Sequence, residues 1–378
     1  MKEPKVTHVI RLNESPMSPP FSGAENHLLF LLPELTRLGV DVELIVIYQS
    51  QGPLMKAAFE KLTQAGVVVT LLPLAVKARW HYLGLLALQR TFDLISLLRA
   101  RRDRIIHLHL DYFGAPLAAW LSKCSCVVMS IHNHEEWLDS FAMRLWFRIM
   151  NLMVSRYIAI SERVKDYFIH VSGIKPGKIE RIYYGVDYKN ELSTEKIREK
   201  YKFPAGKFVF GFIGRLVYQK NIELLLEAAR ILSEVHFVIV GDGELRESLK
   251  HQADGLQNVQ FLGYQPNGHE IMPGFDLFCL PSRFEGLGLV LVEAMQQSVP
   301  IVASRAGAIP EILAEGRYGL LFNGGEVDGL VSSIQFAQRN HAEILEMVHL
   351  AYEYSKEVFT IEEMGSRTVN LYLNVLGK

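Results

Sequence analysis

Residues 278–313 constrain the fold of this chain most, because apolar runs alternate with glycine turns along them. A short apolar run stops at Pro281, and the turn that follows contains Gly286 and Gly288. A helical pattern comes next, and then a second apolar run and a second turn with Gly307. The order predicts strand, loop, helix, strand, loop and helix, with strands at 278–280 and 299–303 and the first helix at 289–295.

A glycine loop that leads into a helix is suited to binding an anion. Glycine lets the backbone turn tightly and approach a ligand closely. The first turn of the helix offers N–H groups without intrahelical partners and the positive end of the helix dipole. The loop at 286–288 is therefore a candidate phosphate site.

Two carboxylates bracket this loop, Glu285 before it and Glu293 on the predicted helix. They are eight positions apart, and a fully helical interval of that length would rise roughly 12 Å. The paired carboxyl groups of a retaining glycosidase are only about 5 Å apart. We therefore interpret the two glutamates as acceptors for hydroxyl groups of one phosphate-containing ligand. The alternative is a solvated helix residue and an unrelated loop charge.

The stretch resembles the donor site of the family 4 retaining glycosyltransferases, which have the GT-B fold. Their E-x7-E motif matches Glu285 and Glu293, with the intervening turn Gly286-Leu287-Gly288-Leu289 also in place. The resemblance implies that Glu293 holds the donor ribose and that Glu285 holds the transferred sugar. It also implies that backbone N–H groups near Gly288 and Leu289 contact the diphosphate.

A second motif, Gly214-Arg215 with Lys220, follows an apolar run at 207–213. Two cations at the carboxyl end of a strand can stabilise a leaving diphosphate. The G-R-L…K motif of the same family matches here, which implies that Arg215 and Lys220 hold the donor diphosphate. A pair of surface bases is the alternative. Gly263 ends a further predicted strand and is expected to offer backbone contacts beside the nucleotide base.

The first half of the chain alternates predicted strands and helices. The strands are expected at 6–10, 40–47, 66–72, 105–108, 126–131 and 157–160, and a long helix at 24–38. This alternation predicts right-handed βαβ units and a parallel sheet, with ligands beyond the carboxyl ends of the strands.

The loops after these strands supply four further candidates. Gly23, before the first helix, occupies a position where the family usually has a glycine pair; an ordinary helix start is the alternative. His132 follows the fifth strand, and the resemblance implies that it lies near the transferred sugar, with His134 as second choice. Asp111, after the fourth strand, is a candidate for the acceptor side.

The chain is expected to form two domains facing a cleft. We predict an N-terminal acceptor-side domain at 1–187, a linker at 188–206 and a donor-binding domain at 207–359, with 360–378 as a helix that crosses back to the first domain. The turn at 182–187 resembles the family's N-G-V-D turn, with Tyr184 in place of Asn. Later helices are expected at 326–337, 342–358 and 360–376.

Composition limits the cofactors and the cellular compartment that can be expected for this chain. Three cysteines cannot form a disulfide framework, and no His or Cys cluster has metal-ligand spacing in the sequence. The N-terminus is too polar for a signal peptide, and no apolar run is long enough to span a bilayer. We therefore expect a cytoplasmic protein without a metal or other cofactor and without a nucleic-acid partner.

Charge is unevenly distributed. Residues 1–187 carry 22 Lys and Arg against 17 Asp and Glu, so the remainder is acidic. Segments 80–104 and 137–157 mix aromatic and aliphatic residues with arginines, which is typical of helices at a membrane surface. Core-facing helices with a solvated edge explain the same pattern, so peripheral contact with the inner membrane stays one of two interpretations.

Together these features predict a retaining, metal-independent hexosyltransferase. The donor is expected to be a UDP-sugar rather than a GDP-sugar, and the acceptor a hydroxyl of a polysaccharide, lipid-linked or lipopolysaccharide-type molecule. A nucleotide-sugar epimerase of the same fold and a non-catalytic GT-B protein are the alternatives. A phosphorylase is less consistent with the sequence, because such enzymes generally need a lysine that binds pyridoxal phosphate and no lysine here lies in a sequence context that suggests one.

Overall fold

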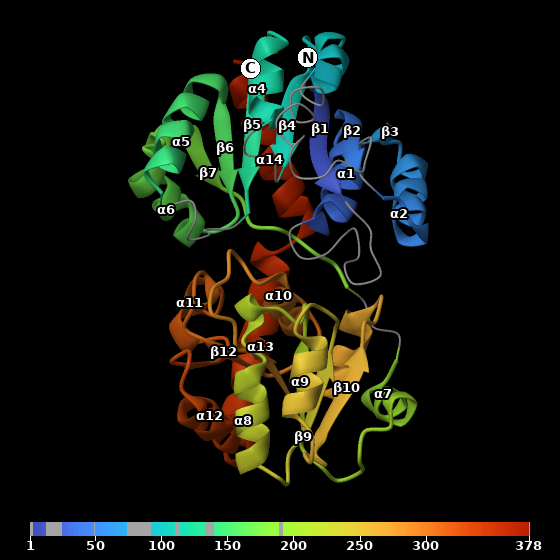
Figure 1. The fold of residues 1–378 in the computed structure, drawn as a ribbon, viewed down its shortest axis with the longest axis vertical. Coiled ribbons are helices and arrows are strands. Elements are labelled where there is room, and N and C mark those ends of the chain that lie inside the picture. The colour runs from blue at the N-terminus through green and yellow to red at the C-terminus, as the bar shows by residue number, and fades with distance from the viewer. Residues whose placement is uncertain are drawn as a thin grey trace. The chain divides into compact units, whose positions relative to one another are not determined.

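The chain forms two compact units, which are described here separately. The computed structural model describes residues 3–12, 25–48, 50–73, 92–109, 114–132, 140–188 and 192–377. One unit comprises Met1–Gly185 together with Ile361–Lys378, and the other comprises Val186–Thr360. Each contains one parallel sheet with helices packed against it (Figure 1).

The first unit is built on a seven-stranded sheet of order β3-β2-β1-β4-β5-β6-β7, in which all pairings are parallel. Its strands are β1 (Lys5–Leu12), β2 (Asp41–Tyr48), β3 (Val68–Pro73), β4 (Ile105–His109), β5 (Cys126–Ile131), β6 (Arg156–Ala159) and β7 (Ile179–Arg181). Its helices are α1 (Leu28–Arg37), α2 (Pro53–Gln64), α4 (Gly114–Leu121), α5 (Phe141–Met153), α6 (Glu162–Ser172) and α14 (Ile361–Val375).

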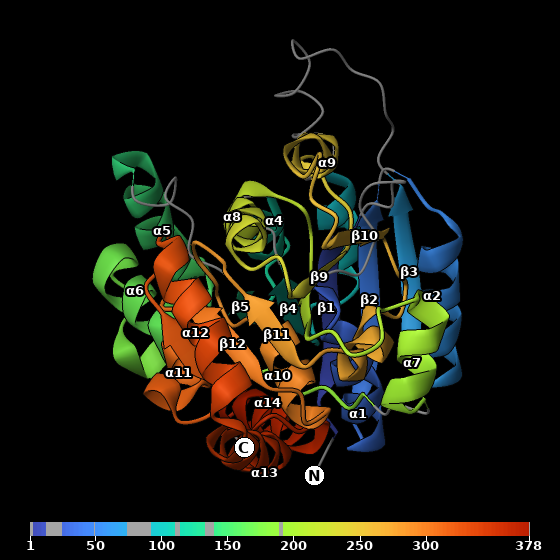
Figure 2. The same ribbon diagram turned by 90° about the horizontal axis from the view of Figure 1, so that it is seen from below.

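Burial explains why these strands read as continuous apolar runs. A parallel sheet is covered on both faces, so both sets of side chains are removed from water. All five residues of β4 are buried, for example. The C-terminal helix α14 packs against α1 (Figures 1 and 2). Its Tyr372 is fully buried in the core of the first unit.

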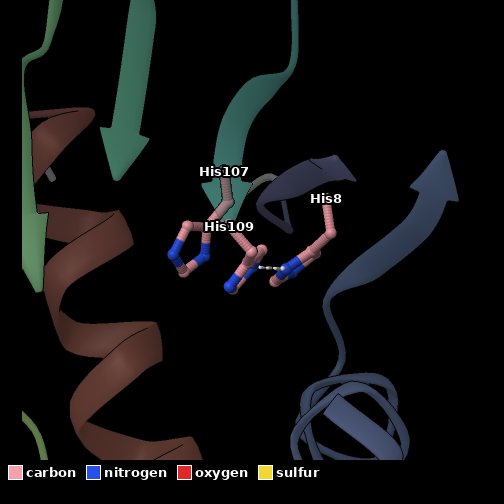
Figure 3. A group of neighbouring side chains, drawn as sticks. All are labelled: His8, His107 and His109. Carbon is pink, nitrogen blue, oxygen red and sulfur yellow. Dashed lines mark hydrogen bonds between the residues drawn. The ribbon is translucent and has the colours of Figure 1, made fainter. Parts of the chain in front are cut away.

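Three histidines form a buried cluster under α14. His8 of β1 is in register with His107 of β4, and His109 points to the same side of the sheet because side chains alternate along a strand. The His8 Nδ1 and His109 Nε2 atoms are 3.0 Å apart (Figure 3). His107 contacts the Tyr372 hydroxyl through Nδ1 at 2.7 Å and the Ser130 hydroxyl through Nε2 at 2.8 Å.

The sequence spacing predicted no set of metal ligands, but the fold brings His8 together with His107 and His109, which lie far from it along the chain. One ligand atom from each of His8, His107 and His109 lies within 4.8 Å of the others. Hydrogen bonds nevertheless engage most of these ring nitrogens, since the Tyr372 hydroxyl also lies 3.4 Å from His8 Nε2. Of the six ring nitrogens of these three histidines, only Nδ1 of His109 lacks a hydrogen-bond partner in the described part of the chain. Hydrogen bonding is thus sufficient to explain the cluster.

The second unit contains a six-stranded parallel sheet of order β10-β9-β8-β11-β12-β13. Its strands are β8 (Val209–Ile213), β9 (His236–Val240), β10 (Val259–Gly263), β11 (Leu277–Leu280), β12 (Ile301–Ser304) and β13 (Leu320–Phe322). Its helices are α7 (Thr194–Tyr201), α8 (Glu223–Ile231), α9 (Arg246–Gln252), α10 (Leu289–Gln296), α11 (Ile309–Ile312), α12 (Val327–Arg339) and α13 (His341–Val358).

The strand order places a topological switch in each sheet. The chain passes outward in one direction from β1 and in the other from β4, and the same holds for β8 and β11. Ligands of open α/β sheets bind outside the carboxyl ends of the strands at such points. The loops after β8 and β11 carry Arg215, Lys220 and Glu285, so the switch of the second sheet is the position to search for a site.

The strands predicted from apolar runs are present, with bounds shifted by a few residues. The short strands β7 and β13 were not predicted. The segment 188–206, expected as a linker, contains α7, whose single buried residue Ile197 packs close to Gly274 in the second unit. This helix was missed because its surface is almost entirely polar. In the described residues, no helix is long and apolar enough to cross a membrane.

We predict that acid selectively destabilises the first unit. Burial, the largest cause, lowers the pKa of His8 to about 3 and holds the pKa of His107, His109 and His132 well below 6.5. Below about pH 6.5 the unfolded histidines bind protons that the folded ones do not. Stability is therefore complete above that pH and falls as the pH decreases below it, by at most about 1.4 kcal/mol per pH unit for each histidine. For His8 this loss extends to about pH 3.

The measurement is urea unfolding followed by tryptophan fluorescence at about pH 7.5 and about pH 5.5. All four tryptophans precede residue 186, so the signal reports the first unit alone. His8→Gln should reduce the pH dependence, whereas His170→Gln, at an exposed position on α6, should leave it unchanged. Equal unfolding midpoints at the two pH values in the wild-type protein would contradict the prediction.

Candidate donor site

An ion pair joins the two loops at the switch of the second sheet. Lys220 lies in a short 3-10 turn (Tyr218–Lys220) after β8, and Glu285 lies in the loop after β11. The Lys220 Nζ and Glu285 Oε1 atoms are 2.5 Å apart. Both side chains are largely buried, with 14% and 7% of their surfaces exposed. Removing one partner of such a pair costs about 3–5 kcal/mol, because the other charge is left buried and unpaired.

A serine completes the environment of Glu285. The Ser282 hydroxyl donates a hydrogen bond to the same oxygen, Oε1, at 2.6 Å. Ser282 is itself fully buried, and its carbonyl accepts a hydrogen bond from Ser304 at the end of β12. The carboxylate is thus held by a cation and a hydroxyl whose positions are set by three different strands.

Further hydrogen bonds tie the same two loops together. The Arg283 N–H donates to the Gln219 carbonyl at 2.8 Å, and the Gln219 amide donates to the Phe284 carbonyl at 2.9 Å. Asn221 donates from Nδ2 to the Pro281 carbonyl at 3.3 Å. Asn221 has a φ of 53°, a left-handed conformation that asparagine tolerates better than most residues. The loops therefore form one hydrogen-bonded unit.

Glycines allow the backbone to pass close to this unit. A Cβ atom on Gly307 would lie 2.1 Å from the Glu285 carbonyl oxygen, and one on Gly241 would lie 1.8 Å from the Gly214 carbonyl oxygen. Gly307 has a φ of +55° and Gly241 a φ of +136°, which L side chains rarely adopt. The carbonyl of Gly263 accepts a hydrogen bond from the Gly241 N–H at 2.8 Å.

Helix α10 begins at the glycine turn, as the sequence indicated. Gly288 precedes its first residue with a φ of 81°, and Leu289 opens the helix. Gly286 and Leu287 are buried, whereas Gly288 and Leu289 are partly exposed. The first N–H groups of α10 therefore face a region that ligand atoms can approach, which fits the anion site inferred from the turn.

Glu293 lies on α10, one turn beyond its N-terminal end. Its side chain is partly buried, and desolvation raises the pKa of its carboxyl to about 7. The two glutamates of the E-x7-E pattern thus differ in environment. Glu285 is paired with a cation, while the pKa of Glu293 is raised by desolvation, and carboxyls perturbed in this way are candidates for ligand binding.

Arg215 is exposed directly after β8 and Gly214. It forms no ion pair with any residue that the structure describes, in contrast to Lys220. Its guanidinium is therefore available to a phosphate group, for which its planar array of donors is well shaped.

In the first unit, His132 lies at the end of β5 with only 3% of its surface exposed. Its Nδ1 atom is 2.7 Å from the hydroxyl of Tyr184, which is also buried. The Tyr184 ring stacks on His27, with centroids 3.8 Å apart and planes 1° from parallel. Tyr184 occupies the position where the family usually has Asn, and sequence reasoning did not assign it this contact.

Sequence reasoning also missed Ser282, Gln219 and Asn221, which hold the two loops in place. Gln219 and Asn221 flank Lys220, so their proximity to the motif was the available signal. Three predicted residues, Gly23, Asp111 and His134, lie outside the described residues. Their predicted roles stay predictions.

Two family models match the chain. The model described as "Glycosyl transferases group 1" matches residues 193–357, which include both loops of the candidate donor site. The model described as "Glycosyltransferase Family 4" matches residues 21–190. Between them they span most of the sequence.

Relatives and solved structures agree with these matches. The UDP-Gal:alpha-D-GlcNAc-diphosphoundecaprenol alpha-1,3-galactosyltransferase of Escherichia coli is 27% identical over 271 residues, covering 64% of this chain and 68% of that protein. The O-antigen biosynthesis glycosyltransferase WclY of E. coli is 22% identical, covering 76% and 80%. The structure of Anabaena HepE in complex with UDP-glucose superposes with a TM-score of 0.78 at 22% identity, covering 98% and 99%.

We predict that Gly307→Ala disrupts the Glu285 loop, whereas Gly325→Ala does not. Both glycines have positive φ, so each alanine introduces backbone strain of about 1–2 kcal/mol. Only at position 307 does the new Cβ also collide with backbone atoms, while nothing lies within 4 Å at position 325. We expect calorimetric unfolding to show a loss of stability larger by at least about 1 kcal/mol for Gly307→Ala. Equal losses would mean that the Glu285 loop adapts without cost.

Proposed function

Because the chain belongs to the group 1 glycosyltransferases of the GT-B type, we propose that it transfers a hexose from a UDP-sugar to a hydroxyl of a glycan or lipid-linked acceptor. The observation that carries this proposal is the Lys220–Glu285 ion pair at the switch of the second sheet. It holds a cation and a carboxylate beside a glycine turn and a helix N-terminus. A diphosphate sugar presents the complementary groups, two phosphates and several hydroxyls.

Arg215 and Lys220 serve the leaving diphosphate in this proposal. Negative charge grows on the departing phosphate as the bond to the sugar lengthens, and fixed cations stabilise that charge most in the transition state. Arg215 forms no ion pair in the described structure, so its charge is not shared with a carboxylate and can interact fully with the phosphate. Lys220 shares its charge with Glu285, so it links the diphosphate to the carboxylate that handles the sugar.

The remaining donor contacts of this proposal rest on the family resemblance of the loops. Glu293 accepts hydrogen bonds from the ribose hydroxyls, and Glu285 from hydroxyls of the transferred sugar. Backbone groups at Gly214 and Gly263 contact the nucleotide. The turn formed by Gly286, Leu287, Gly288 and Leu289 directs N–H groups at the diphosphate. From the first unit, His132 contributes to binding the sugar, with Gly23 on the donor side and Asp111 and His134 on the acceptor side.

We propose that the anomeric configuration is retained. The acceptor hydroxyl attacks the anomeric carbon from the face that the diphosphate leaves. A new C–O bond forms, the bond between the sugar and the phosphate oxygen breaks, and the departing phosphate accepts the acceptor proton. The paired cations neutralise the charge of the leaving group in a reaction that proceeds without a divalent metal.

Two comparisons support the choice of UDP and of the acceptor class. The E. coli galactosyltransferase is named for a UDP-Gal donor and a diphosphoundecaprenol-linked acceptor, and WclY for O-antigen biosynthesis. HepE has been crystallised with UDP, with UDP and glucose and with UDP-glucose. These are properties of the relatives, and they make a UDP-sugar and a lipid-linked glycan the first substrates to test.

The test begins with thermal unfolding in the presence of UDP, GDP and ADP. We expect UDP alone to raise the midpoint, since a ligand at a hundredfold excess over its Kd stabilises the folded state by about 2.7 kcal/mol. Labelled UDP-glucose and UDP-galactose are then incubated with and without a bacterial lipid extract. Arg215→Ala and Lys220→Ala should each reduce transfer more than about tenfold, which corresponds to about 1.4 kcal/mol in the barrier.

Arg317→Ala, which removes an exposed arginine belonging to neither loop, is the matched control and should retain the wild-type rate. Since Lys220→Ala leaves Glu285 unpaired, its folding is checked by calorimetry, and Lys220→Met with Glu285→Gln removes both charges. Wild-type rates in folded Arg215→Ala and Lys220→Ala would refute the roles of the cations. Epimerisation of the donor in the absence of an acceptor would identify an epimerase. Failure to react with any donor would identify a non-catalytic protein.

We predict that donor affinity depends on the ionisation of Glu293. A carboxylate accepts hydrogen bonds through both oxygens, whereas its protonated form has reduced acceptor capacity. With a pKa of about 7, Glu293 loses its charge as the pH falls below neutrality. UDP-glucose affinity should then fall, by at most about tenfold per pH unit. UDP-glucose is chosen because its diphosphate, unlike that of UDP, has no ionisation near neutral pH.

Calorimetric titration at about pH 8 and about pH 6 provides the measurement. Glu293→Gln should bind more weakly at the higher pH and show little pH dependence. If wild type and Glu293→Gln lose affinity in parallel on acidification, another group is responsible. Glu285→Gln serves as a second comparison, because it should weaken UDP-glucose binding more than UDP binding.

A further inference from the structure

Helix α5 has two apolar faces, of which only one is buried. Met143, Phe147 and Met150 face the core of the first unit. Phe141 and Leu152 are exposed over 83% and 84% of their surfaces. Burial against the first unit explains the inner face, but large apolar side chains with this degree of exposure are not explained by folding of the chain alone.

The exposed side chains form one continuous stripe. Leu145 and Ile149 lie between Phe141 and Leu152 and are exposed over 49% and 39% of their surfaces. Successive residues of a helix are offset by about 100°, so positions 141, 145, 149 and 152 fall within a narrow arc. The centre of that arc lies roughly 170° from the centre of the buried set. The stripe therefore runs along the side of α5 opposite to the core, for about 17 Å.

Positive charge flanks the stripe. Arg144 and Arg148 are exposed, one turn apart, and neither forms an ion pair with any residue that the structure describes. No aspartate or glutamate occurs at positions 140–161, nor at positions 114–132. In the described residues the surface thus combines apolar side chains with cations, and neither α4 nor α5 contributes an acidic group to it.

The neighbouring helix α4 adds to this surface. It packs against α5, and its C-terminal end exposes Trp120 and Leu121, at 54% and 42%, followed by the exposed Lys123. On its other side, α5 lies beside α6 (Figures 1 and 2). Tryptophan with leucine and nearby lysine is the combination found where proteins meet the headgroup region of a bilayer.

We propose that the outer face of α5, with the end of α4, docks onto the surface of an anionic lipid bilayer. Phe141, Leu145, Ile149 and Leu152 enter the boundary between headgroups and acyl chains, and α5 lies parallel to the bilayer plane. Arg144 and Arg148 contact the lipid phosphates beside the stripe. The sequence left two interpretations open for this segment, a helix at a membrane surface and a helix facing the core. Membrane contact explains the outer face of α5, and packing against the core explains its inner face.

Charge complementarity selects the lipid as the occupant. A lipid surface of negative charge attracts arginines along the whole length of a stripe and also takes up the apolar side chains beside them. The inference does not depend on glycosyl transfer, so it can fail or hold independently of the proposed function.

The test is flotation of the full-length protein with vesicles. One set contains phosphatidylcholine alone, and the other contains about one part phosphatidylglycerol in three. We expect binding to the anionic vesicles only, weakened by salt. Phe141→Ser with Leu152→Ser should reduce the bound fraction by at least about tenfold. Arg144→Gln with Arg148→Gln should remove the preference for anionic lipid.

Ile231→Ser with Leu345→Ser is the matched control, since these exposed apolar residues lie in the second unit and should not affect flotation. Unchanged unfolding midpoints would show that all variants are folded. The proposal is overturned if the wild-type protein stays with the soluble fraction, or if Phe141→Ser with Leu152→Ser floats as well as wild type. A wild-type dimer that the same double variant converts to monomers, without vesicle binding, would assign the face to a second copy of the chain.

Discussion

The ion pair between Lys220 and Glu285 is the interaction on which the candidate site depends. It joins a loop after β8 to a loop after β11, and the two strands are neighbours in the sheet. In bulk water such a pair contributes little, but both groups here are shielded and a serine hydroxyl fixes the carboxylate. Its importance is geometric, because it sets the spacing of a cation and a carboxylate beside the N-terminus of α10.

Buried polar groups are stabilised in two ways. Lys220 and Glu285 of the second unit form an ion pair, and Arg101 and Glu43 of the first unit do the same. In the first unit, His8, His107, His109 and His132 are kept neutral by desolvation; His107 and His132 are linked to tyrosine and serine hydroxyls, and His109 to His8. Neutral imidazoles can be both donor and acceptor, so they fill a parallel-sheet core without a counterion. The cost is that their protonation competes with folding.

The surface of the first unit exposes a set of apolar side chains on α5. Met143, Phe147 and Met150 of α5 are buried, yet a stripe of four apolar side chains remains in contact with solvent, flanked by arginines. A folded chain can leave such a stripe exposed when another phase or molecule removes it from water. Transfer to an acceptor carried on lipid, as in the proposed function, would be served by an enzyme resting on that same surface.

The sequence by itself determined the periodic features. Apolar runs located the strands of both sheets, and glycine turns located the loops before the helices, because strand and helix periods and turn chemistry are local properties. The motifs around Arg215, Lys220, Glu285 and Glu293 indicated a family and its donor site. Short strands such as β7 and the polar helix α7 were missed, since they carry few periodic apolar positions.

Tertiary structure alone decided which residues meet. Lys220 and Glu285 are 65 positions apart, and Tyr184 and His132 are 52 apart, so no local pattern could pair them. The same holds for the histidine cluster, whose members come together through the register of β1 and β4. For α5 the sequence showed more apolar residues than one face can hold, together with arginines, and only packing within the first unit selected the apolar face that stays outside.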